Sequence, residues 1–444
     1  MSVDPARRVA ADLVIAVERD SAYSNLLLPR LLRERRLAPT DAAFATEIGY
    51  GTLRWQGVLD QVVASAAQRP VAELDLSVRA VLRVGAYQLL HTRVPPHAAV
   101  STTVDLVKQV AGHRPAGFVN AVMRKISQKD WAGWTETLAP KDEVGRLAFE
   151  HGYPQWVAVA FLEALRGETS ELARALIADR PATHLMARPG AIDRDALMVQ
   201  AGPHSSRGPF SPYAVHLAGG DPAGIAAVRG GCARVQDEGS QLVALALASA
   251  PVEGQESAWL DACAGPGGKS SLLAGLLPPG ARLVASELQP HRAVLVRAGV
   301  RGTATTVIAG DGLRPAWREA AFDRVLVDVP CSGLGALRRR PEVRWRRNEA
   351  DLSRLVPLQA ALLDNAVSAV RPGGVVCYAT CSPHLAETTE VIADLLAKRS
   401  DVELIDARPL LPGVPELGIG PTVQLWPHRH GTDAMFIAML RRRV

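Results

Sequence analysis

The sequence predicts a multidomain protein in which an all-helical N-terminal region precedes an α/β region at the carboxyl end. Three observations carry this prediction. The chain has 444 residues, which is enough for two to four domains. Residues 1–130 place apolar side chains at helical spacing and show few alternating stretches. From about residue 240 onward, apolar strands alternate with helical stretches, which is typical of a parallel, doubly wound sheet.

The first helix shows how the N-terminal pattern arises. Asp4 stands where it can cap a helix whose first residue is Pro5, and Val9, Leu13 and Val17 then fall on one face. The stretches DAAFATEIGYGTLRW, LSVRAVLRVGAYQLL and GFVNAVMRKI continue in the same style. We therefore expect a helical domain over residues 1–140 and a helical linker over residues 141–180.

The residue composition of the chain changes after the linker. RPATHLMARPG and the Gly- and Pro-rich stretch up to residue 231 are typical of short strands and turns, so we expect a small α+β segment over residues 181–238. The α/β region then takes residues 239–444. Its expected strands lie in AWLDACAGPGG, RLVASE, TTVIAGD, DRVLVDVP, GVVCYAT and AMFIAML, with helices such as KSSLLAGLL, PHRAVLVRAG and LVPLQAALLDNAVSAV between them.

Composition excludes several classes of protein. The chain has no run of 18 or more apolar residues, and its first residues lack the apolar stretch of a signal peptide. Its five cysteines are few, odd in number and without CxxC spacing, which argues against a disulfide framework and a structural zinc site. We expect a cytoplasmic monomer with free thiols, no bound metal and no membrane contact.

The distribution of charge indicates nucleic acid as a partner. The net charge is +5, and residues 1–130 alone carry 17 Lys and Arg against 12 Asp and Glu, so the remaining residues sum to zero. Within that neutral remainder, LRRRPEVRWRR surrounds the single acid Glu342 with six arginines. We expect these arginines to contact nucleic-acid phosphates, although a solvated arginine-rich surface would show the same pattern: Arg338, Arg339, Arg340, Arg344, Arg346 and Arg347. Trp345 among them could stack on a base or be a half-buried loop residue.

The ends of the first three strands of the α/β region are typical of a site for a nucleoside-bearing cofactor. DACAGPGGKS follows the first strand, and its glycines, Gly265, Gly267 and Gly268, let the backbone approach a ligand before a helix begins. Glu287 ends the second strand, where an acid can accept hydrogen bonds from ribose hydroxyls. Asp311 ends the third strand, where an acid can bind an adenine amino group.

Two other interpretations of the glycine stretch are weighed against this one. CAGPGGKS nearly fits the phosphate-binding pattern G-x-x-x-x-G-K-[ST], but Cys263 replaces the first glycine, so a nucleotide-triphosphatase loop is not intact. The stretch could also be a turn that only connects a strand to a helix.

The fourth and fifth strands end in cysteine motifs. DVPCSGLG places Asp328 and Cys331 after the fourth strand, and YATCSP places Cys381 after the fifth. These strands are neighbours in doubly wound sheets, so Cys331 and Cys381 are expected to face one pocket beside the cofactor. Cys377 lies inside the fifth strand among apolar residues, and we interpret it as a core residue.

In this order, DACAGPGGKS, DVPCSGLG and YATCSP resemble the RNA cytosine-C5 methyltransferases that use S-adenosyl-L-methionine. The helical N-terminal region looks like a NusB-type RNA-binding domain. ALRRRPEVRWRR and LWPHRHGTDAMFIA resemble the RsmB branch, also called Sun or Fmu, which methylates a cytosine of 16S ribosomal RNA. The resemblance implies a Rossmann-like core with a mixed, mostly parallel seven-stranded sheet, a ribosomal RNA partner before or during small-subunit assembly, and a role in rRNA processing.

The resemblance also implies a role for each matching residue. Cys381 would be the nucleophile, Cys331 would assist product release, and Asp328 would bind both the target cytosine and the cofactor region. The remaining cofactor residues would be Cys263, Ala264, Gly265, Pro266, Gly267, Gly268, Lys269, Glu287 and Asp311. A transfer RNA target, and an RNA-binding antitermination-like factor with a non-catalytic core, are the alternatives that the sequence leaves open.

Overall fold

The computed structural model describes residues 4–177 and 181–444, and the chain folds into two compact units. Unit 1 comprises Met1–Ala178 together with Leu337–Asn348. Unit 2 comprises Asp179–Ala336 together with Glu349–Val444. This division differs from the four consecutive segments expected from the sequence, because a short piece from the middle of the α/β region groups with the N-terminal unit.

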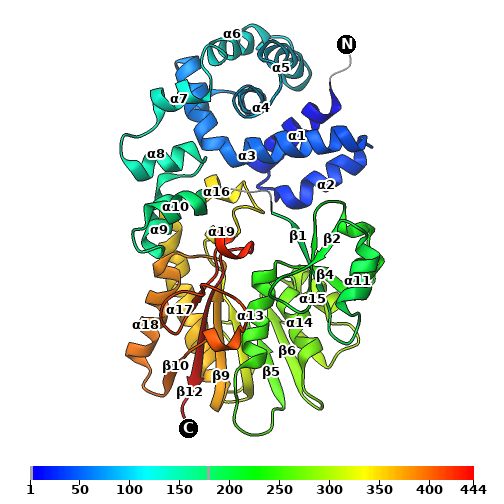
Figure 1. The fold of residues 1–444 in the computed structure, drawn as a ribbon, viewed down its shortest axis with the longest axis vertical. Coiled ribbons are helices and arrows are strands. Elements are labelled where there is room, and N and C mark those ends of the chain that lie inside the picture. Colours follow the sequence, from blue (N-terminus) through cyan, green and yellow to red (C-terminus); the bar gives the residue numbers. More distant parts are fainter. Residues whose placement is uncertain (1–3, 178–180) are drawn as a thin grey trace. The chain divides into compact units, whose positions relative to one another are not determined.

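Unit 1 is helical throughout its described residues, as predicted (Figure 1). Asp4 caps α1 by accepting hydrogen bonds from the backbone N–H groups of Ala6 and Arg7, and Val9, Leu13 and Val17 are buried. The α-helices run in chain order: α1 (Pro5–Arg19), α2 (Ser24–Glu34), α3 (Pro39–Ala67), α4 (Leu76–His91), α5 (Pro96–Ala111), α6 (Ala116–Ile126), α7 (Trp131–Leu138), α8 (Glu143–Glu150), α9 (Gln155–Ala164) and α10 (Thr169–Leu176).

The segment Leu337–Asn348, which we name the strap, packs into the helices of unit 1 and contains the short helix α16 (Val343–Arg346). The buried carboxylate of Glu342 accepts hydrogen bonds from the backbone N–H and the hydroxyl of Ser24. Trp345 donates its indole N–H to the carbonyl oxygen of Arg54 at 2.8 Å and lies against Gly57, where a Cβ atom would come within 2.2 Å of its ring. The strap is therefore an integral part of the helical core.

Arg344 is the largest fully buried side chain of the described residues. Its guanidinium lies 3.4 Å from the centroid of the Tyr153 ring and donates to the carbonyl oxygen of Gly152 at 2.8 Å. Burial lowers the pKa of Arg344 to about 10, which still leaves the side chain charged at neutral pH. An aromatic face and backbone carbonyls stabilise this charge, with no acidic partner among the causes of the shift.

Unit 2 begins with a small antiparallel sheet of four strands in the order β2-β3-β1-β4, as expected of a small α+β segment. Its strands are β1 (Thr183–Ala187), β2 (Ser205–Arg207), β3 (Ala214–Leu217) and β4 (Ala233–Val235), and its helices are α11 (Arg194–Ala201) and α12 (Ala226–Arg229). The long helix α13 (Glu238–Ser249) follows and covers the second sheet.

The second sheet has the strand order β10-β12-β9-β8-β5-β6-β7, and the short strand β11 pairs with β12 beside this path. The strands β5 to β9 pair in parallel, whereas β12 is antiparallel to both β9 and β10. The predicted mixed, mostly parallel sheet is therefore confirmed, with seven strands on the main path. The strands are β5 (Ala258–Asp261), β6 (Arg282–Glu287), β7 (Thr305–Ala309), β8 (Phe322–Asp328), β9 (Val370–Thr380), β10 (Val402–Ile405), β11 (Val423–Gln424) and β12 (Phe436–Arg442).

Helices cover both faces of this sheet because successive side chains of a strand point to opposite sides. Leu326, Val375 and Cys377 pack with residues of α13 and of α14 (Gly268–Leu276). Val327 and Tyr378 pack on the other face with residues of α17 (Leu352–Ala369) and α18 (Thr389–Lys398). The helix α15 (Pro290–Gly299) lies beside β6 and β7. The carboxyl ends of the parallel strands are left for the site.

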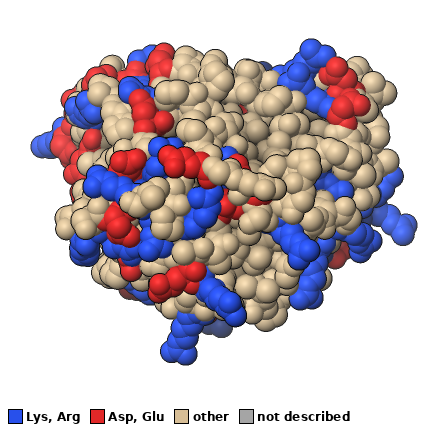
Figure 2. Space-filling model, turned by 90° about the horizontal axis from the view of Figure 1, so that it is seen from below, with Lys and Arg blue, Asp and Glu red and all other residues tan. Residues whose placement is uncertain are grey.

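Charges of both signs occur on the face of the molecule drawn in Figure 2, where blue and red side chains are interspersed. No patch of one sign dominates this view. Among the described residues, no helix has the length and apolar character needed to cross a membrane, and no cluster of His, Cys, Asp and Glu is arranged to hold a metal ion.

We predict that Arg344→Ala destabilises the helical unit by about 2–4 kcal/mol, because it removes charge-assisted hydrogen bonds and leaves a cavity. Differential scanning calorimetry of the full chain measures the shift. The matched control is Arg340→Ala, since this exposed guanidinium lies 5.8 Å from the Tyr23 ring centroid and is expected to contribute less than about 1 kcal/mol. Equal effects of the two substitutions would contradict the structural role of Arg344.

Candidate active site

Two cysteines meet at the carboxyl ends of β8 and β9. These strands pair in parallel, with Asp328 opposite Ala379, so the residues that follow them emerge side by side. The sulfur atoms of Cys331 and Cys381 lie 3.3 Å apart, which is hydrogen-bonding distance for a thiol and a second sulfur. The structure thus brings together the two cysteines that the sequence singled out.

The loops carrying the two cysteines are cross-linked by hydrogen bonds. The backbone N–H of Gly335 donates to the carbonyl oxygen of Cys381 at 2.9 Å, and the hydroxyl oxygens of Ser332 and Ser382 lie within hydrogen-bonding distance, 3.1 Å apart. Gly335 also accepts a hydrogen bond from the backbone N–H of Ala434, and a Cβ at position 335 would lie 2.1 Å from the Ala434 carbonyl oxygen. These bonds hold the two sulfur atoms in a defined relation to each other.

A buried carboxylate, Glu387, supports the Cys331 loop from below and has no solvent exposure. It accepts hydrogen bonds from the backbone N–H of Ser332 at 2.7 Å, from the Ser332 hydroxyl, and from the side-chain amide of Gln359 at 2.9 Å. Sequence reasoning did not assign this role. The only local signal was that Glu387 follows the Cys381 motif closely in the sequence. The burial of Glu387 depends on β8, β9 and α17 together, so it cannot be inferred from one segment.

The environment of the sulfur pair favours the protonated form of Cys331. The pKa of Cys331 is raised well above that of a free thiol by its hydrogen bond with Cys381, by burial, and by the charges of Glu387 and Asp328. Cys331 therefore remains protonated, and its thiol can donate a hydrogen bond to the sulfur of Cys381.

Lys269 and Asp328 form an ion pair beside the cysteines. The ammonium nitrogen of Lys269 lies 2.6 Å from Oδ2 of Asp328, and the lysine side chain is largely buried. Burial disfavours the charge of Lys269, but Asp328 and Cys381 favour it, so the pKa of Lys269 is raised and the side chain stays cationic. The buried ammonium group of Lys269 therefore lies within electrostatic range of both Asp328 and Cys381.

The glycine loop between β5 and α14 has the conformation that its sequence suggested. Gly265 and Gly267 both have positive φ, at +56° and +88°. A Cβ at Gly267 would come within 2.8 Å of the Cα of Val296, whereas one at Gly265 would meet no atom within 4 Å. The loop is closed by hydrogen bonds from Ala264 N to Ser286 O and from Gly267 N to Ala264 O, and Pro266 O accepts from Arg234. It therefore presents open backbone at the start of a helix.

Acidic side chains surround this loop. Glu287 ends β6 and is largely buried, and its Oε1 accepts from the backbone N–H of Gln289 at 2.9 Å. Burial raises the pKa of the Cys263 thiol within the loop. Four carboxylates raise it further: Asp261, Asp328, Glu287 and Asp311. Cys263 is accordingly an unreactive thiol, and the concentration of negative charge suits a cationic ligand.

Three buried polar atoms near this edge of the sheet have no hydrogen-bond partner within the described chain. They are Oδ1 of Asp261, Oγ of Ser286 and Oε1 of Gln236. Gln236 also lies beside Gly268, where a Cβ would come within 3.4 Å of its side-chain amide. Buried polar groups normally have partners, so these orphaned acceptors indicate that a polar ligand completes the site. The residues fit S-adenosyl-L-methionine, which offers a cationic sulfonium, an ammonium group and ribose hydroxyls.

The remaining cysteines take no part in this arrangement. Cys377 is fully buried within β9 and burial raises the pKa of its thiol, which confirms its interpretation as a core residue. Cys232 lies half-buried beside the small sheet.

The prediction that six arginines contact RNA is wrong for Arg344, whose charge is fully buried against Tyr153 within unit 1. The neighbouring Arg346 is exposed, but it donates to backbone carbonyl oxygens of Val17, Ser21 and Ala22. The sequence LRRRPEVRWRR alone could not reveal these contacts of Arg344 and Arg346, because the residues that accept their hydrogen bonds lie about 190 to 330 residues earlier in the chain. For the other arginines of the strap, RNA binding stays a prediction.

Two family models match the chain. The model described as "16S rRNA methyltransferase RsmB/F" matches residues 246–441, and the NusB family model matches residues 4–128. The first therefore covers most of the second sheet and both cysteine motifs. The second covers α1 to α6 and stops before α7.

Two relatives from bacteria match nearly the full length of this chain. A protein named "Putative methyltransferase MT1451" from Mycobacterium tuberculosis is 52% identical over 99% of this chain and 97% of its own. The "Probable ribosomal RNA small subunit methyltransferase B" of Bacillus subtilis is 31% identical over 98% of both chains.

Solved structures share the fold. The crystal structure of PH0851 covers 100% of both chains with a TM-score of 0.85 at 22% identity. A methyltransferase homolog protein from Pyrococcus horikoshii covers 67% of this chain and 97% of its own, with a TM-score of 0.54 at 23% identity.

We predict that Asp261→Asn removes a pH dependence of stability. Burial raises the pKa of Asp261 from 3.8 to about 6, so its neutral form stabilises the folded state fully below pH 4 and this contribution is lost as the pH rises through 6. The shift corresponds to about 3 kcal/mol. In urea unfolding without ligand, the variant should therefore gain stability relative to the wild type between pH 4 and pH 7.

The control for this experiment is Asp195→Asn, which changes an exposed carboxylate and should keep a constant difference within about 0.5 kcal/mol. If the free energies of unfolding of the wild type and Asp261→Asn changed in parallel with pH, the folded state would not disfavour the charged form of Asp261.

Proposed function

Because the chain belongs to the RsmB/F family of S-adenosylmethionine-dependent RNA methyltransferases, we propose that it transfers a methyl group to carbon 5 of a cytosine in 16S ribosomal RNA through a covalent cysteine adduct. The observation that supports this mechanism is the 3.3 Å contact between Cys331 and Cys381 at the ends of two adjacent parallel strands. The names of the full-length relatives and the family description support 16S rRNA as the substrate.

The cofactor residues of the proposal surround the glycine loop. The backbone of residues 263–269 holds the methionine part, Glu287 the ribose and Asp311 the adenine. S-adenosyl-L-methionine supplies an electrophilic methyl group on a sulfonium. The carboxylates around Cys263 stabilise its positive charge in the bound state.

Carbon 5 of cytosine is a poor nucleophile, and the role of Cys381 is to activate it. The thiolate of Cys381 adds to carbon 6, which forms a carbon–sulfur bond and moves electron density to carbon 5. Carbon 5 then accepts the methyl group. This covalent step replaces one difficult reaction by two easier ones. The cationic Lys269 and the sulfur of Cys331 both lie beside the sulfur that begins the reaction.

Asp328 orients the base during this addition. One of its oxygens pairs with Lys269, which fixes the carboxylate, and the second oxygen is left for the polar edge of the cytosine around N3. This oxygen accepts a hydrogen bond from the amino group of the base and from a proton that N3 takes up from water as sulfur attacks. That proton disperses the negative charge that develops on the ring. Lys269 is thus a positioning residue for Asp328 as well as a source of positive charge.

Release of the product requires a proton transfer. The hydrogen on carbon 5 leaves as a proton, its bonding electrons restore the ring double bond, and the bond between carbon 6 and sulfur breaks to return the thiolate of Cys381. A water accepts the proton from carbon 5. We assign assistance in this step to Cys331, because its thiol lies next to the attacking sulfur and can donate a hydrogen bond to it as it leaves. The target base must first leave its stack, so looped or single-stranded RNA is the natural substrate.

We predict that Cys331→Ser traps the covalent intermediate. Addition and methyl transfer proceed, but elimination slows, so a protein–RNA adduct that survives denaturing electrophoresis should accumulate in the presence of the cofactor. Absence of the adduct in an RNA-binding variant would reject the release role of Cys331.

The matched variant is Cys381→Ser, which removes the attacking sulfur, the hydrogen-bonding neighbour of Cys331. It should abolish transfer of labelled methyl groups, by at least about 10³-fold, and should form no adduct while it still binds RNA. Full activity of this variant would reject the covalent mechanism.

The substrate is tested by mapping 5-methylcytosine in total RNA from cells with and without the protein. We expect one cytosine of 16S rRNA to lose its methyl group in cells without the protein. Loss confined to a transfer RNA would replace the proposed substrate, and an unchanged map would reject the activity.

A further inference from the structure

Most of the net charge of the chain is concentrated on one helical hairpin of unit 1. Residues 93–125, which contain α5 and most of α6, carry five Lys and Arg against the single acid Asp105, or +4 of the total +5. None of the five basic side chains is fully buried, and they are Arg93, Lys108, Arg114, Arg124 and Lys125. A cationic surface of this density attracts a polyanion.

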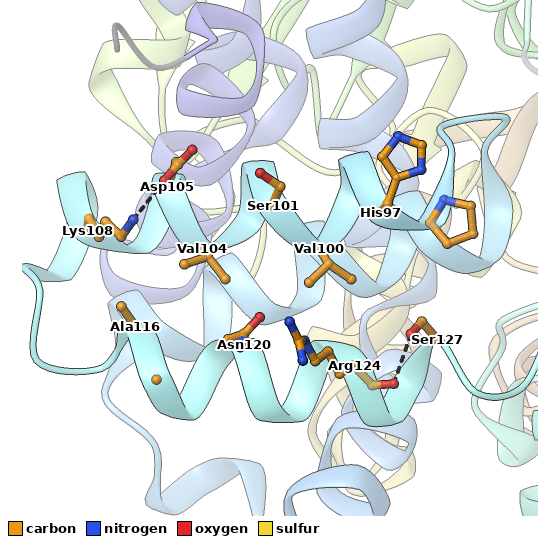
Figure 3. Close-up of a pocket in the computed structure, with 12 residues that line it drawn as sticks. His97, Val100, Ser101, Val104, Asp105, Lys108, Ala116, Asn120, Arg124 and Ser127 are labelled. Atoms are coloured by element: carbon orange, nitrogen blue, oxygen red, sulfur yellow. Dashed lines mark hydrogen bonds and ion pairs between the residues drawn. The ribbon is translucent and has the colours of Figure 1, made fainter.

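A groove of about 760 Å³ lies between the two helices of this hairpin. Figure 3 shows Val100 and Val104 of α5 pointing toward α6, and Asn120 and Arg124 of α6 pointing back toward α5. Apolar side chains therefore form the middle of the groove, and an amide and a guanidinium reach into it. His97 stands near the Arg124 end.

Several polar groups in the groove are available to a ligand. Within the described residues, the side chains of His97, Asn120 and Arg124 make no hydrogen bond or ion pair. Lys108, at the opposite end, pairs with the partly exposed Asp105 at 2.9 Å. Exposed pairs of this kind are weak, about 0–1 kcal/mol, so a phosphate can compete for the lysine.

We propose that the groove between α5 and α6 binds an unpaired segment of the substrate RNA, an inference that rests on the proposed function and gives the N-terminal unit a defined role in it. Arg124 and His97 contact phosphates at one end and Lys108 contacts a phosphate at the other. Val100 and Val104 pack against the face of a base. Asn120 hydrogen-bonds the edge of that base, as side-chain amides do in sequence-specific recognition.

The dimensions favour a single strand over a duplex. His97 and Lys108 are separated by eleven residues of one helix, which corresponds to about 16 Å, or roughly five nucleotides at the rise of a stacked strand. A base enters an apolar groove only when it is unpaired, whereas duplex RNA presents phosphates and ribose hydroxyls to proteins. An acidic peptide would satisfy the cations but not the amide of Asn120 combined with the apolar floor.

The test uses the full chain and a fluorescein-labelled, single-stranded 16-nucleotide RNA of mixed sequence. We expect Arg124→Gln and Asn120→Ala each to weaken binding measured by anisotropy by roughly five- to tenfold. Loss of one phosphate contact should also reduce the slope of log affinity against log salt by about one for Arg124→Gln. In methyl transfer to protein-free 16S rRNA, both variants should raise KM and leave kcat unchanged.

The matched control is Arg30→Gln, which removes one exposed positive charge from α2 outside the groove and should leave affinity, salt slope and KM unchanged. Equal effects of Arg30→Gln and Arg124→Gln would overturn the proposal, because they would show only an effect of net charge. So would unchanged affinity in both groove variants, or tighter binding of an acidic peptide than of the RNA. If the wild-type protein transfers no methyl group to any RNA, the proposed function is rejected instead. The anisotropy measurements then still decide whether the groove binds RNA.

Discussion

The parallel pairing of β8 with β9 is the constraint on which the site depends. A parallel register ends both strands at the same edge of the sheet, and it is this edge that places Cys331 against Cys381. The loops that follow then require support, because each leaves the sheet through a tight turn. Glu387 supplies it from the core, and Gly335 supplies it at the point where a side chain would collide with Ala434. The chemistry of the sulfur pair is therefore a property of the sheet as much as of the cysteines.

Buried charge performs different tasks in the two units. In unit 2, Lys269 and Asp328 form a largely buried ion pair that lies close to Cys381. In unit 1, Arg344 is buried without such a partner and relies on the Tyr153 ring and backbone carbonyls. The first arrangement keeps a pair of charges at the candidate active site, and the second keeps a segment in its place. A guanidinium can serve the second purpose because it is weakly hydrated and stacks on aromatic rings.

Much of the fold and of the site could be predicted because the signals are local. The cap at Asp4, the strand RLVASE and the order of the strand ends each depend on residues close together in sequence, and the structure confirms them. The strand β10 and the hydrogen bonds that Glu387 accepts from the Cys331 loop were not predicted. Both depend on pairing or burial that involves distant segments of the chain. The arginine-rich stretch was misinterpreted at Arg344 for the same reason, since charge composition cannot distinguish a buried guanidinium from an exposed one.

Because of the strap, the two units cannot be separated by a single cut in the sequence. The strap leaves unit 2 five residues after Cys331, contributes Glu342, Arg344 and Trp345 to the helices of unit 1, and returns at Glu349. Neither unit is a continuous piece of sequence. A fragment cut after residue 178 would lack the buried guanidinium of its own core, and the complementary fragment would carry an arginine and a tryptophan without their partners. Domain-swapped chimaeras of this enzyme therefore need to exchange the strap together with the helices that it completes.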